Sequence, residues 1–381
     1  MDFQLNDEQR AFEDAVKRFA QKEIAPGVDQ REERGEFCPE AWKKLCEYGL
    51  PGLVIPTQYG GGGASAVDAV TALIALAEAG KDFSLTGLWA THMLLASMPI
   101  ADLGNPEQKN EYLPRMASGD LIGALALTEP GAGSDATSLS THAVRDGDHY
   151  ILNGSKTFIS NAPIADVFVV VATVDKGARA NGLTMFIVER NFQGLVTGKP
   201  LKKREADSWP TGEVFFDNCR IPAKNLLGEE RKGFQYMLQA LSWERLAFAP
   251  YVGMLASNLK DSIEYSKNRL QFGQPICNFQ LVQAMLSEMK MDLEAALLLT
   301  YKLAWKKDQG KDISMDAAIA KTFITEAAER SSQKAVQIFG GNGCMKEYSI
   351  GRNLWMSKMG TIGGGTSQMQ RTIIGRMLTD R

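Results

Sequence analysis

Residues 128–135 carry the first group of side chains that could do chemistry. They read Thr-Glu-Pro-Gly-Ala-Gly-Ser-Asp and follow an apolar run of strand length. Gly131 and Gly133 lack a Cβ, so the backbone can turn sharply there and approach a ligand closely. The hydroxyls of Thr128 and Ser134, with the free N–H groups of the turn, favour an anion-binding site. A hairpin turn with no ligand is an equally good interpretation, and the spacing matches neither a dinucleotide-binding fingerprint nor a P-loop.

Glu244 is a second candidate because it interrupts an apolar helical stripe. Apolar residues recur at steps of three, four or seven along this segment, and they comprise Phe234, Leu238, Leu241, Phe248, Val252, Leu255 and Leu259. Such residues share one helix face, and Glu244 falls on that face. A carboxylate facing a core is costly unless it is paired or used, and desolvation is how it becomes a usable base near neutral pH. Arg245 is its candidate partner or positioner, and a buried Glu–Arg structural pair is the alternative.

Three glycine-rich or phosphate-binding segments lie at expected helix ends. Thr366 follows three glycines and suits a helix N-cap, and a glycine-flanked helix start can receive a phosphate. Residues 339–343, Phe-Gly-Gly-Asn-Gly, are typical of a helix C-terminus. Arg269 begins the run Arg-Leu-Gln-Phe-Gly and could pair with a phosphate. The alternatives are a plain loop before Thr366, a helix end without a ligand at 339–343, and a solvent-exposed arginine at Arg269.

Three blocks of different periodicity must position these candidates. Helical spacing predicts a helical domain at 1–120, short β-rich segments between turns predict a β-barrel or sandwich domain at 121–229, and helical spacing returns at 230–381. Asn6, with Gln9 at the third helical position, indicates a helix N-cap, and Asp146-Gly147 indicates a hairpin turn. The order α, β, α indicates the α+β class. Four long helices joined by short loops predict a C-terminal four-helix bundle, and they comprise Phe234–Asn268, Phe279–Gln309, Met315–Phe339 and Thr366–Leu378.

Composition excludes several classes of function. The chain is 44% hydrophobic and 23% charged, with a net charge of −3 and no basic block, so nucleic acid is not an expected partner. No apolar run is long enough to cross a membrane, and the three histidines show no metal-ligand spacing. Five scattered cysteines predict reduced thiols, and Met1–Gln4 does not begin a secretory signal, so we expect a cytoplasmic protein.

Six stretches, taken together and in order, resemble the acyl-CoA dehydrogenase superfamily. They are 128–135, 153–161, 213–217, 269–273, 337–343 and 365–368. The resemblance implies an N-terminal helical domain, a central β-barrel domain and a C-terminal four-helix bundle, in agreement with the periodicity. It also implies FAD, bound between the β domain and the bundle and shared across the interface of a homo-oligomer, a dimer or a tetramer.

The resemblance further implies which residues contact the cofactor. These are Leu127, Thr128, Gly133, Ser134, Phe158, Ser160, Arg269, Phe272, Gln280, Gln337, Gly340, Gly341, Thr366 and Gln368. Many relatives have Trp-Ile-Thr where this chain has Phe158-Ile159-Ser160, which keeps an aromatic ring and a hydroxyl. Ser134 and Arg245 are expected on the substrate side.

The chain departs from most relatives at the catalytic base. Many of them place a glutamate directly before the final Gly-Thr, and this chain has Gly364 there. A minority, such as isovaleryl-CoA dehydrogenases, carry the glutamate in a Glu-Arg pair on the bundle helix, and Glu244-Arg245 matches that pattern. The helical stripe and the resemblance therefore point independently to Glu244 as general base, with the hydride passing to the flavin.

Shorter matches resemble a narrower group, the L-prolyl carrier-protein dehydrogenases and oxidases of secondary metabolism. They are residues 161–168, Trp243–Arg245 and Trp305–Gly310. The implied substrate is an L-prolyl group on the phosphopantetheine of an acyl or peptidyl carrier protein, with O2 or an electron-transferring flavoprotein as acceptor. A short- or branched-chain acyl-CoA dehydrogenase acting on a CoA thioester is the alternative. A non-catalytic acyl-thioester binding protein is a third interpretation, because Gly364 replaces the usual base.

Overall fold

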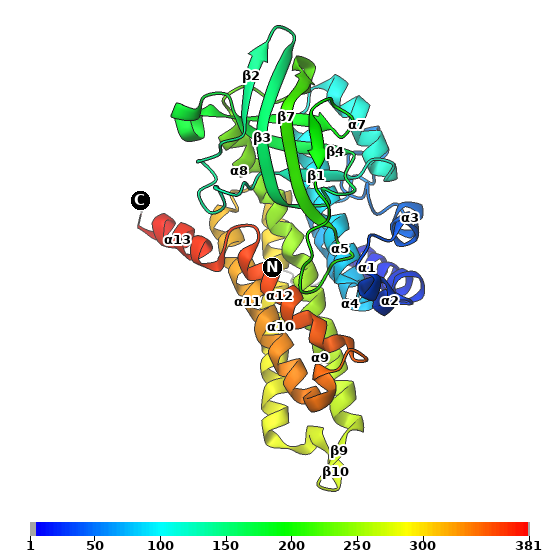
Figure 1. The fold of residues 1–381 in the computed structure, drawn as a ribbon. Coiled ribbons are helices and arrows are strands. Elements are labelled where there is room, and N and C mark those ends of the chain that lie inside the picture. The colour runs from blue at the N-terminus through cyan, green and yellow to red at the C-terminus, as the bar shows by residue number, and fades with distance from the viewer. Residues whose placement is uncertain (1–4, 380–381) are drawn as a thin grey trace. The chain divides into compact units, whose positions relative to one another are not determined.

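The computed structural model describes residues 5–379 as two compact units, each assembled from segments distant in the sequence (Figure 1). The helical unit comprises Met1–Glu33, Ala66–Thr86 and Arg245–Arg381, and the sheet unit comprises Arg34–Ser65 and Gly87–Glu244. The predicted division into three domains at residues 120 and 229 follows the change from helices to strands and back, and it stays a prediction.

The sheet unit contains one eight-stranded sheet. Its strands are β1 (Gly123–Ala126), β2 (His142–Asp146), β3 (His149–Ser160), β4 (Val167–Thr173), β5 (Leu183–Glu189), β6 (Leu195–Thr197), β7 (Thr211–Pro222) and β8 (Leu226–Leu227). Hydrogen bonds connect them in the order β6-β7-β3-β2-β4-β5-β8, with β1 parallel to β4. The predicted Asp146-Gly147 turn joins β2 to β3, and Gly147 takes a φ of +61° there. The predicted central β domain is confirmed.

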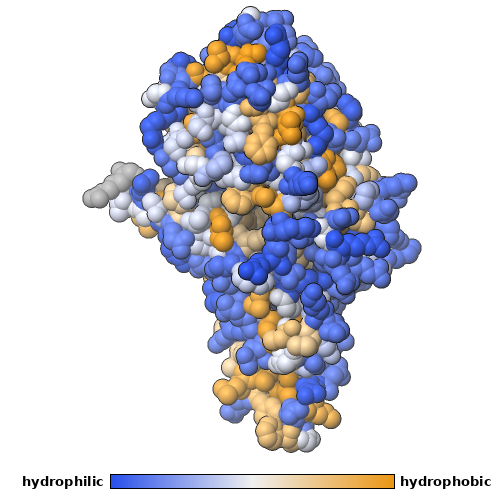
Figure 2. Space-filling view, viewed as in Figure 1, coloured by the Kyte–Doolittle hydropathy of each residue, from blue (hydrophilic) through white to orange (hydrophobic). Residues whose placement is uncertain are grey.

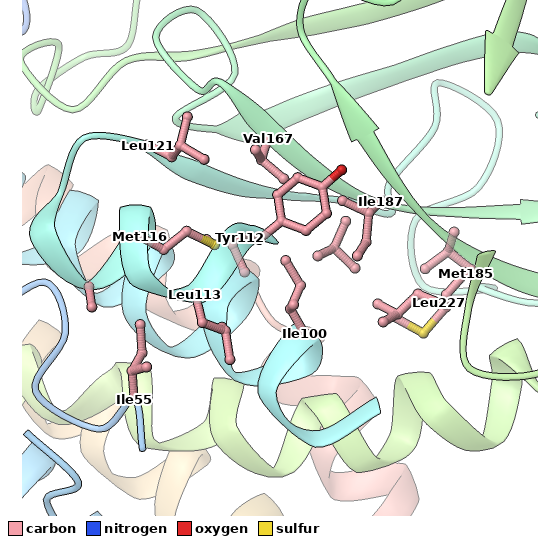
Figure 3. Packing of buried hydrophobic residues seen from close by; sticks show 14 of the residues in the cluster. Ile55, Ile100, Tyr112, Leu113, Met116, Leu121, Val167, Met185, Ile187 and Leu227 are labelled. Atoms are coloured by element: carbon pink, nitrogen blue, oxygen red, sulfur yellow. The ribbon is translucent and has the colours of Figure 1, made fainter. Parts of the chain in front are cut away.

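Strand β4 is buried on both faces, so its side chains alternate between two cores. Val167, Val169 and Val171 pack against the helices, and Phe168 and Val170 face the second core. Figure 3 shows the first core, in which Tyr112, Leu113 and Met116 of α7 (Pro106–Ser118) and Ile100 of α6 (Met98–Leu103) meet the sheet. The second core draws residues from β2, β3, β4, β5 and β7, so the sheet curls around its own interior.

Further helices complete the sheet unit. They are α3 (Pro39–Glu47), a π-helix at Thr91–Ser97 and α8 (Gly233–Glu244), while α5 (Phe83–Ala90) crosses the boundary between the units. Asn161, which has a φ of +67°, fixes the end of β3, because its buried amide donates to the carbonyls of Leu88 and Gly123 and accepts from the Trp209 indole. These contacts hold the residue that follows β3 against the start of β1.

The helical unit is built of helices of 7 to 29 residues. They are α1 (Asp7–Phe19), α2 (Val28–Arg34), α4 (Ala66–Gly80), α9 (Ala249–Asn268), α10 (Gln280–Asp308), α11 (Ser314–Phe339), α12 (Arg352–Ile362) and α13 (Ser367–Leu378). The predicted Asn6–Gln9 capping box starts α1, while Met1–Gln4, on which the expected lack of a leader rests, lie outside the described residues. α4 and α9 cross closely, because a Cβ on Gly253 would lie 2.5 Å from the Ile74 carbonyl oxygen.

The predicted single helix Phe234–Asn268 is wrong, because the chain breaks at the candidate base. α8 ends at Glu244, a 3₁₀ turn spans Arg245–Phe248, and α9 starts at Ala249. Pro250 accounts for the break, since it has no N–H to donate back along the helix and its ring clashes with the preceding turn. The stripe is therefore not one continuous face, and Leu238 is 53% exposed.

Helix α12 is absent from the prediction, and its packing explains why. Its sequence contains Gly360, which weakens the helical signal. A Cβ at this glycine would lie 2.7 Å from the Tyr251 ring and 2.9 Å from Thr325, so the glycine permits close packing against α9 and α11. Within residues 5–379, no helix has the length and apolar character needed to cross a membrane, and no cluster of ligating side chains suits a metal ion.

Candidate cofactor and catalytic site

The glycine-rich segment folds as a tight hairpin turn after β1. Glu129 and Ala132 exchange two backbone hydrogen bonds of 3.1 Å across Pro130 and Gly131. Neither Gly131 nor Gly133 takes a positive φ, so the backbone conformation does not itself require glycine. A Cβ at either position would meet no atom within 4 Å. Both glycines therefore border open space, which fits a ligand that lies against the backbone.

Phe158 is held in an unusual conformation beside this turn. Its φ is +56°, the residue is 69% exposed, and the pairing of β3 with β7 shifts register between Lys156 and Ile159. The turn and the strand are joined directly, because the Thr157 N–H donates to the Thr128 carbonyl at 2.9 Å. A non-glycine residue in the left-handed region is strained, and such strain clusters at functional sites. An exposed, strained aromatic residue suits a surface for a flat ring.

A buried ion pair that the sequence analysis missed supports the turn from behind. Lys156 Nζ lies 2.8 Å from Glu129 Oε1 and also donates to the Leu127 carbonyl at 3.0 Å. Glu129 accepts further hydrogen bonds from the Ser140 N–H and hydroxyl and from the Thr141 N–H. The pair thus fixes the main chain at Leu127, the residue expected to contact the cofactor.

Burial and attraction act in opposite directions on this pair. Burial lowers the pKa of Lys156 to about 8, although Glu129 opposes the change. Burial alone would raise the pKa of Glu129, but the charge of Lys156 and the hydrogen bonds outweigh it and bring that pKa to about 2. A signal existed in the sequence, because Lys156 falls on the same strand alternation as the buried Tyr150 and Leu152.

His92 fixes the start of β1. Its Nδ1 accepts from the Gly123 N–H at 3.1 Å, and its Nε2 lies 3.0 Å from the Met116 carbonyl oxygen, so the ring is neutral with the proton on Nε2. Burial lowers the pKa of His92 to about 4. β1, which leads to Leu127 and Thr128, is therefore held at its first residue by a histidine that stays uncharged.

The remaining predicted residues of the sheet unit lie where a ligand can reach them. Leu127 and Thr128 are half-buried after β1, Gly133 and Ser134 are exposed in the turn, and Ser160 is half-buried at the end of β3. Hydrogen bonds from β3 bring the Leu127–Thr128 segment and the Phe158 segment together. Glu244 is the last residue of α8 and is half-buried rather than sealed in a core.

In the helical unit, Arg245 is tied to Gly364, the residue that the resemblance compares with the catalytic base of many relatives. Arg245 Nη1 donates to the Gly364 carbonyl oxygen at 2.6 Å. Gly364 has a φ of +62°, and a Cβ there would lie 2.6 Å from Cζ of Phe248. A side chain at residue 364 therefore does not fit in this arrangement without moving Phe248 or Arg245.

Thr366 and Gln368 start the last helix as predicted. Thr366 is the N-cap of α13, and its hydroxyl accepts from the Met369 N–H at 3.2 Å. Gln368 is exposed in the first turn. The N–H groups of this turn point away from the helix and favour a negatively charged group.

A second group of predicted residues lies at the other end of α9. Arg269 caps α9, Phe272 forms the turn of the hairpin β9 (Leu270–Gln271) and β10 (Gln274–Pro275), and Gln280 begins α10. Phe272 is 92% exposed with a φ of +50°, and apolar surface gathers at this end (Figure 2).

The end of α11 belongs to this second group. The Tyr265 hydroxyl donates to the Phe339 carbonyl, which places Gln337, Gly340 and Gly341 near the end of α9. All three residues are exposed, and a Cβ on either glycine would meet no atom within 4 Å. α9 has 20 residues, so Arg269 at its end lies about 30 Å along the helix from Phe248, its N-cap, which packs beside Gly364.

These features fit FAD. In the sheet unit, the open space beside Gly131 and Gly133 and the exposed Phe158 suit backbone contacts and ring stacking with a flavin. In the helical unit, taken by itself, the helix start at Thr366 suits a phosphate group. The residues expected to contact the cofactor are exposed or half-buried throughout.

Three family models match consecutive parts of the chain. "Acyl-CoA dehydrogenase, N-terminal domain" matches residues 6–120, "Acyl-CoA dehydrogenase, middle domain" matches 124–219, and "Acyl-CoA dehydrogenase, C-terminal domain" matches 231–379. Together they cover nearly the whole chain in the family's order.

Curated relatives and solved structures agree with these matches. The chain is 40% identical to probable acyl-CoA dehydrogenase YngJ of Bacillus subtilis and 40% identical to an L-prolyl-[peptidyl-carrier protein] dehydrogenase of Pseudomonas fluorescens, each over 99% of this chain and 100% of the relative. The crystal structure of the prolyl acyl carrier protein oxidase AnaB is 36% identical, with a TM-score of 0.96 over 98% of this chain and 100% of that one. PigA with FAD and proline is 34% identical, with a TM-score of 0.97 over 100% and 99%.

Proposed function

Because the chain belongs to the acyl-CoA dehydrogenase family, we propose that it oxidises an L-prolyl group carried as a phosphopantetheine thioester, with Glu244 as the general base. The family assignment makes the chain an FAD-dependent CH–CH dehydrogenase of acyl thioesters. It thereby sets aside the non-catalytic thioester-binding protein that Gly364 had left open. The proposal concerns the acyl group, its carrier and the residue that takes the proton.

One observation carries the assignment of the base. Residue 364 has no room for a side chain, since Phe248 fills the volume that a Cβ there would need. Arg245, the residue directly after Glu244, donates its hydrogen bond to the carbonyl of that same glycine. Glu244 is thus directly followed by the residue that contacts this loop, and many relatives carry their catalytic glutamate in the same loop.

The chain's own residues then have separate tasks. The thioester carbonyl makes the α-proton acidic, and the Glu244 carboxylate accepts that proton. When bound, FAD accepts the hydride from the adjacent ring position. Ser134 and Arg245 bind on the substrate side, while Phe158, Ser160 and the Leu127–Thr128 segment hold the cofactor. Loss of one proton and one hydride gives a dehydroproline thioester, and a second round gives a pyrrole.

The two groups of cofactor residues support a homo-oligomer. Arg269 caps one end of α9, and Phe248, which packs beside Gly364 in the loop before Thr366, caps the other end about 30 Å away. We propose that the hairpin end of one subunit completes the FAD site of another, in a dimer or a tetramer. The exposed Phe272 and the apolar surface around it suit such a contact. O2 or an electron-transferring flavoprotein would reoxidise the cofactor.

A short- or branched-chain acyl-CoA dehydrogenase is the second candidate function. The equal 40% identity to YngJ and to the prolyl-carrier relative supports both. The prolyl proposal rests in addition on the resemblance of residues 161–168, 243–245 and 305–310 to the prolyl-carrier group. Loss of flavin absorbance on mixing with L-prolyl carrier protein, but not with butyryl- or isovaleryl-CoA, would support it. Loss only with the CoA thioesters would favour the alternative.

Glu244→Gln tests the base. The variant should bind FAD like the wild-type protein and fail to lose flavin absorbance with any substrate, because the amide cannot accept the proton. Glu264→Gln, an exposed position on α9, is the matched control and should reduce normally. Flavin reduction by Glu244→Gln near the wild-type rate would refute the assignment.

A further inference from the structure

We propose that Arg245 is a positioning residue for Glu244 and that the Gly364 carbonyl is the group to which it is anchored. On this view the Gly364 carbonyl has a task of its own, because it holds the junction between α8 and the following turn, where Glu244 lies. The inference rests on the proposed role of Glu244, and its test below distinguishes a failure of either idea.

The contact itself is short and charge-assisted. Arg245 Nη1 lies 2.6 Å from the Gly364 carbonyl oxygen, and Arg245 is half-buried. Hydrogen bonds from an ionised donor are shorter and about twice as strong as those between neutral groups. The contact joins the residue after Glu244 to a loop 119 residues later in the chain.

The acceptor carbonyl is held rigidly. Gln370 Nε2 donates to the same Gly364 oxygen at 2.9 Å, and Lys321 Nζ donates to the Gly365 oxygen at 2.8 Å. Lys321 also lies over the Phe248 ring, 5.2 Å from its centroid. The loop thus has fixed partners on α11 and α13, and it offers Arg245 an acceptor in one place.

Glycine is required at residue 364 for this arrangement. Its φ of +62° lies in the left-handed region, and a Cβ would lie 2.6 Å from Phe248 and 3.3 Å from the Arg245 guanidinium. A larger residue would therefore displace the ring, the guanidinium or the carbonyl. The same glycine that cannot carry a base is the one residue type that fits beneath Arg245.

The α-helix is interrupted at the junction that carries Glu244. α8 ends at Glu244, a 3₁₀ turn spans Arg245–Phe248, and Pro250 supplies no N–H to continue the α-helical pattern. The backbone of Glu244 is joined directly to that of Arg245, so the anchored arginine restrains the main chain from which the Glu244 side chain leaves.

The central test compares Arg245→Met with Arg245→Lys. The Met variant keeps an unbranched apolar stem and loses the donor, so we expect kcat for flavin reduction to fall about 10- to 100-fold, with FAD absorbance little changed and any rise in KM smaller than the fall in kcat. The Lys variant keeps a cationic donor and should recover a large share of kcat. Arg330→Met, which breaks an exposed bidentate pair with Asp292 on α10, is the control and should leave kcat unchanged.

Gly364→Ala provides a second variant that keeps every charge. Its Cβ should move the carbonyl away from Arg245 and lower kcat in the same manner, with FAD content preserved. If Arg245→Met does not fold, the Gly364→Ala variant still tests whether the contact between Arg245 and the Gly364 carbonyl affects kcat. A normal kcat in Gly364→Ala would overturn the proposal, since the anchoring carbonyl would then be dispensable.

Other outcomes are equally decisive. A kcat within twofold of wild type in Arg245→Met, or a rise in KM with unchanged kcat, would overturn the positioning role, because the second pattern indicates uniform substrate binding. Glu244→Gln separates the two ideas. Retained activity in Glu244→Gln refutes the base, whereas lost activity there combined with full activity in Arg245→Met refutes only the anchor.

Discussion

Lys156 Nζ lies 2.8 Å from Glu129 Oε1, and both side chains are buried behind the turn expected to hold the cofactor. The lysine also binds the Leu127 carbonyl, and the glutamate also binds the Ser140 and Thr141 backbone. One ion pair therefore connects the glycine-rich turn, the start of β2 and the middle of β3. Its charges are satisfied only while all three segments stay in place.

Removing one member of this pair should destabilise the protein far more than removing both. Glu129→Gln or Lys156→Met leaves a buried group without its partner and should cost about 3–5 kcal/mol. The double variant removes both groups and should regain most of that loss. Urea unfolding of the four proteins measures the coupling. The same cycle at Lys290 and Glu294, an exposed pair on α10, should give less than about 1 kcal/mol, and additive losses at the buried pair would contradict the prediction.

His92 should make the stability depend on pH. Its pKa falls from 6.5 in the unfolded chain to about 4 in the folded one, so only the unfolded chain binds a proton between these values. Stability is then full above pH 6.5 and declines as pH falls toward 4, by about 3 kcal/mol in total. Urea unfolding at pH 7 and at pH 5 measures the decline. His92→Gln should flatten it and His142→Gln should not; an unchanged slope in His92→Gln would assign the effect elsewhere.

Phe158→Ala should weaken FAD binding about tenfold, because the exposed ring supplies stacking surface. Release of flavin on dilution, followed by its fluorescence, measures the affinity. Phe215→Ala removes the ring of a residue that is 40% exposed on β7 and should leave the affinity unchanged. Equal affinities in the Phe158 variant and the wild-type protein would show that the strained residue serves some other purpose.

Gly360→Ala should destabilise the helical unit, because the added methyl would lie within 3 Å of Tyr251 and Thr325. Overpacking of this kind costs about 1–3 kcal/mol. Gly375→Ala is the matched control in α13, where a Cβ meets no atom within 4 Å, and it should be neutral or stabilising. Thermal unfolding of both variants decides the matter, and similar melting temperatures would disprove the tight crossing of α12.

Local signals in the sequence predicted most of the fold. The Asn6 capping box, the Asp146-Gly147 turn and the Thr366 N-cap are all present. Each depends on residues a few positions apart, so composition and spacing are sufficient to find it. The break after Glu244 was not predicted because the apolar spacing continues across it, although Pro250 in the sequence indicates a helix interruption.

Features that depend on distant residues were not predictable. Helix α12 owes its place to Gly360, whose value appears only when Tyr251 is beside it. The Lys156–Glu129 pair joins residues 27 positions apart, and a single sequence does not reveal that they meet. The tie between Arg245 and Gly364 spans most of the C-terminal region for the same reason.

The fit of Phe248 over Gly364 also bears on how such enzymes can change through mutation. A change that placed an acid on the loop would need a glutamate at residue 364 and a smaller residue at 248. Either change alone would disturb the packing of Phe248 on Gly364. An acid on this loop and the present packing are therefore mutually exclusive, so moving the acid requires coordinated substitutions at both positions.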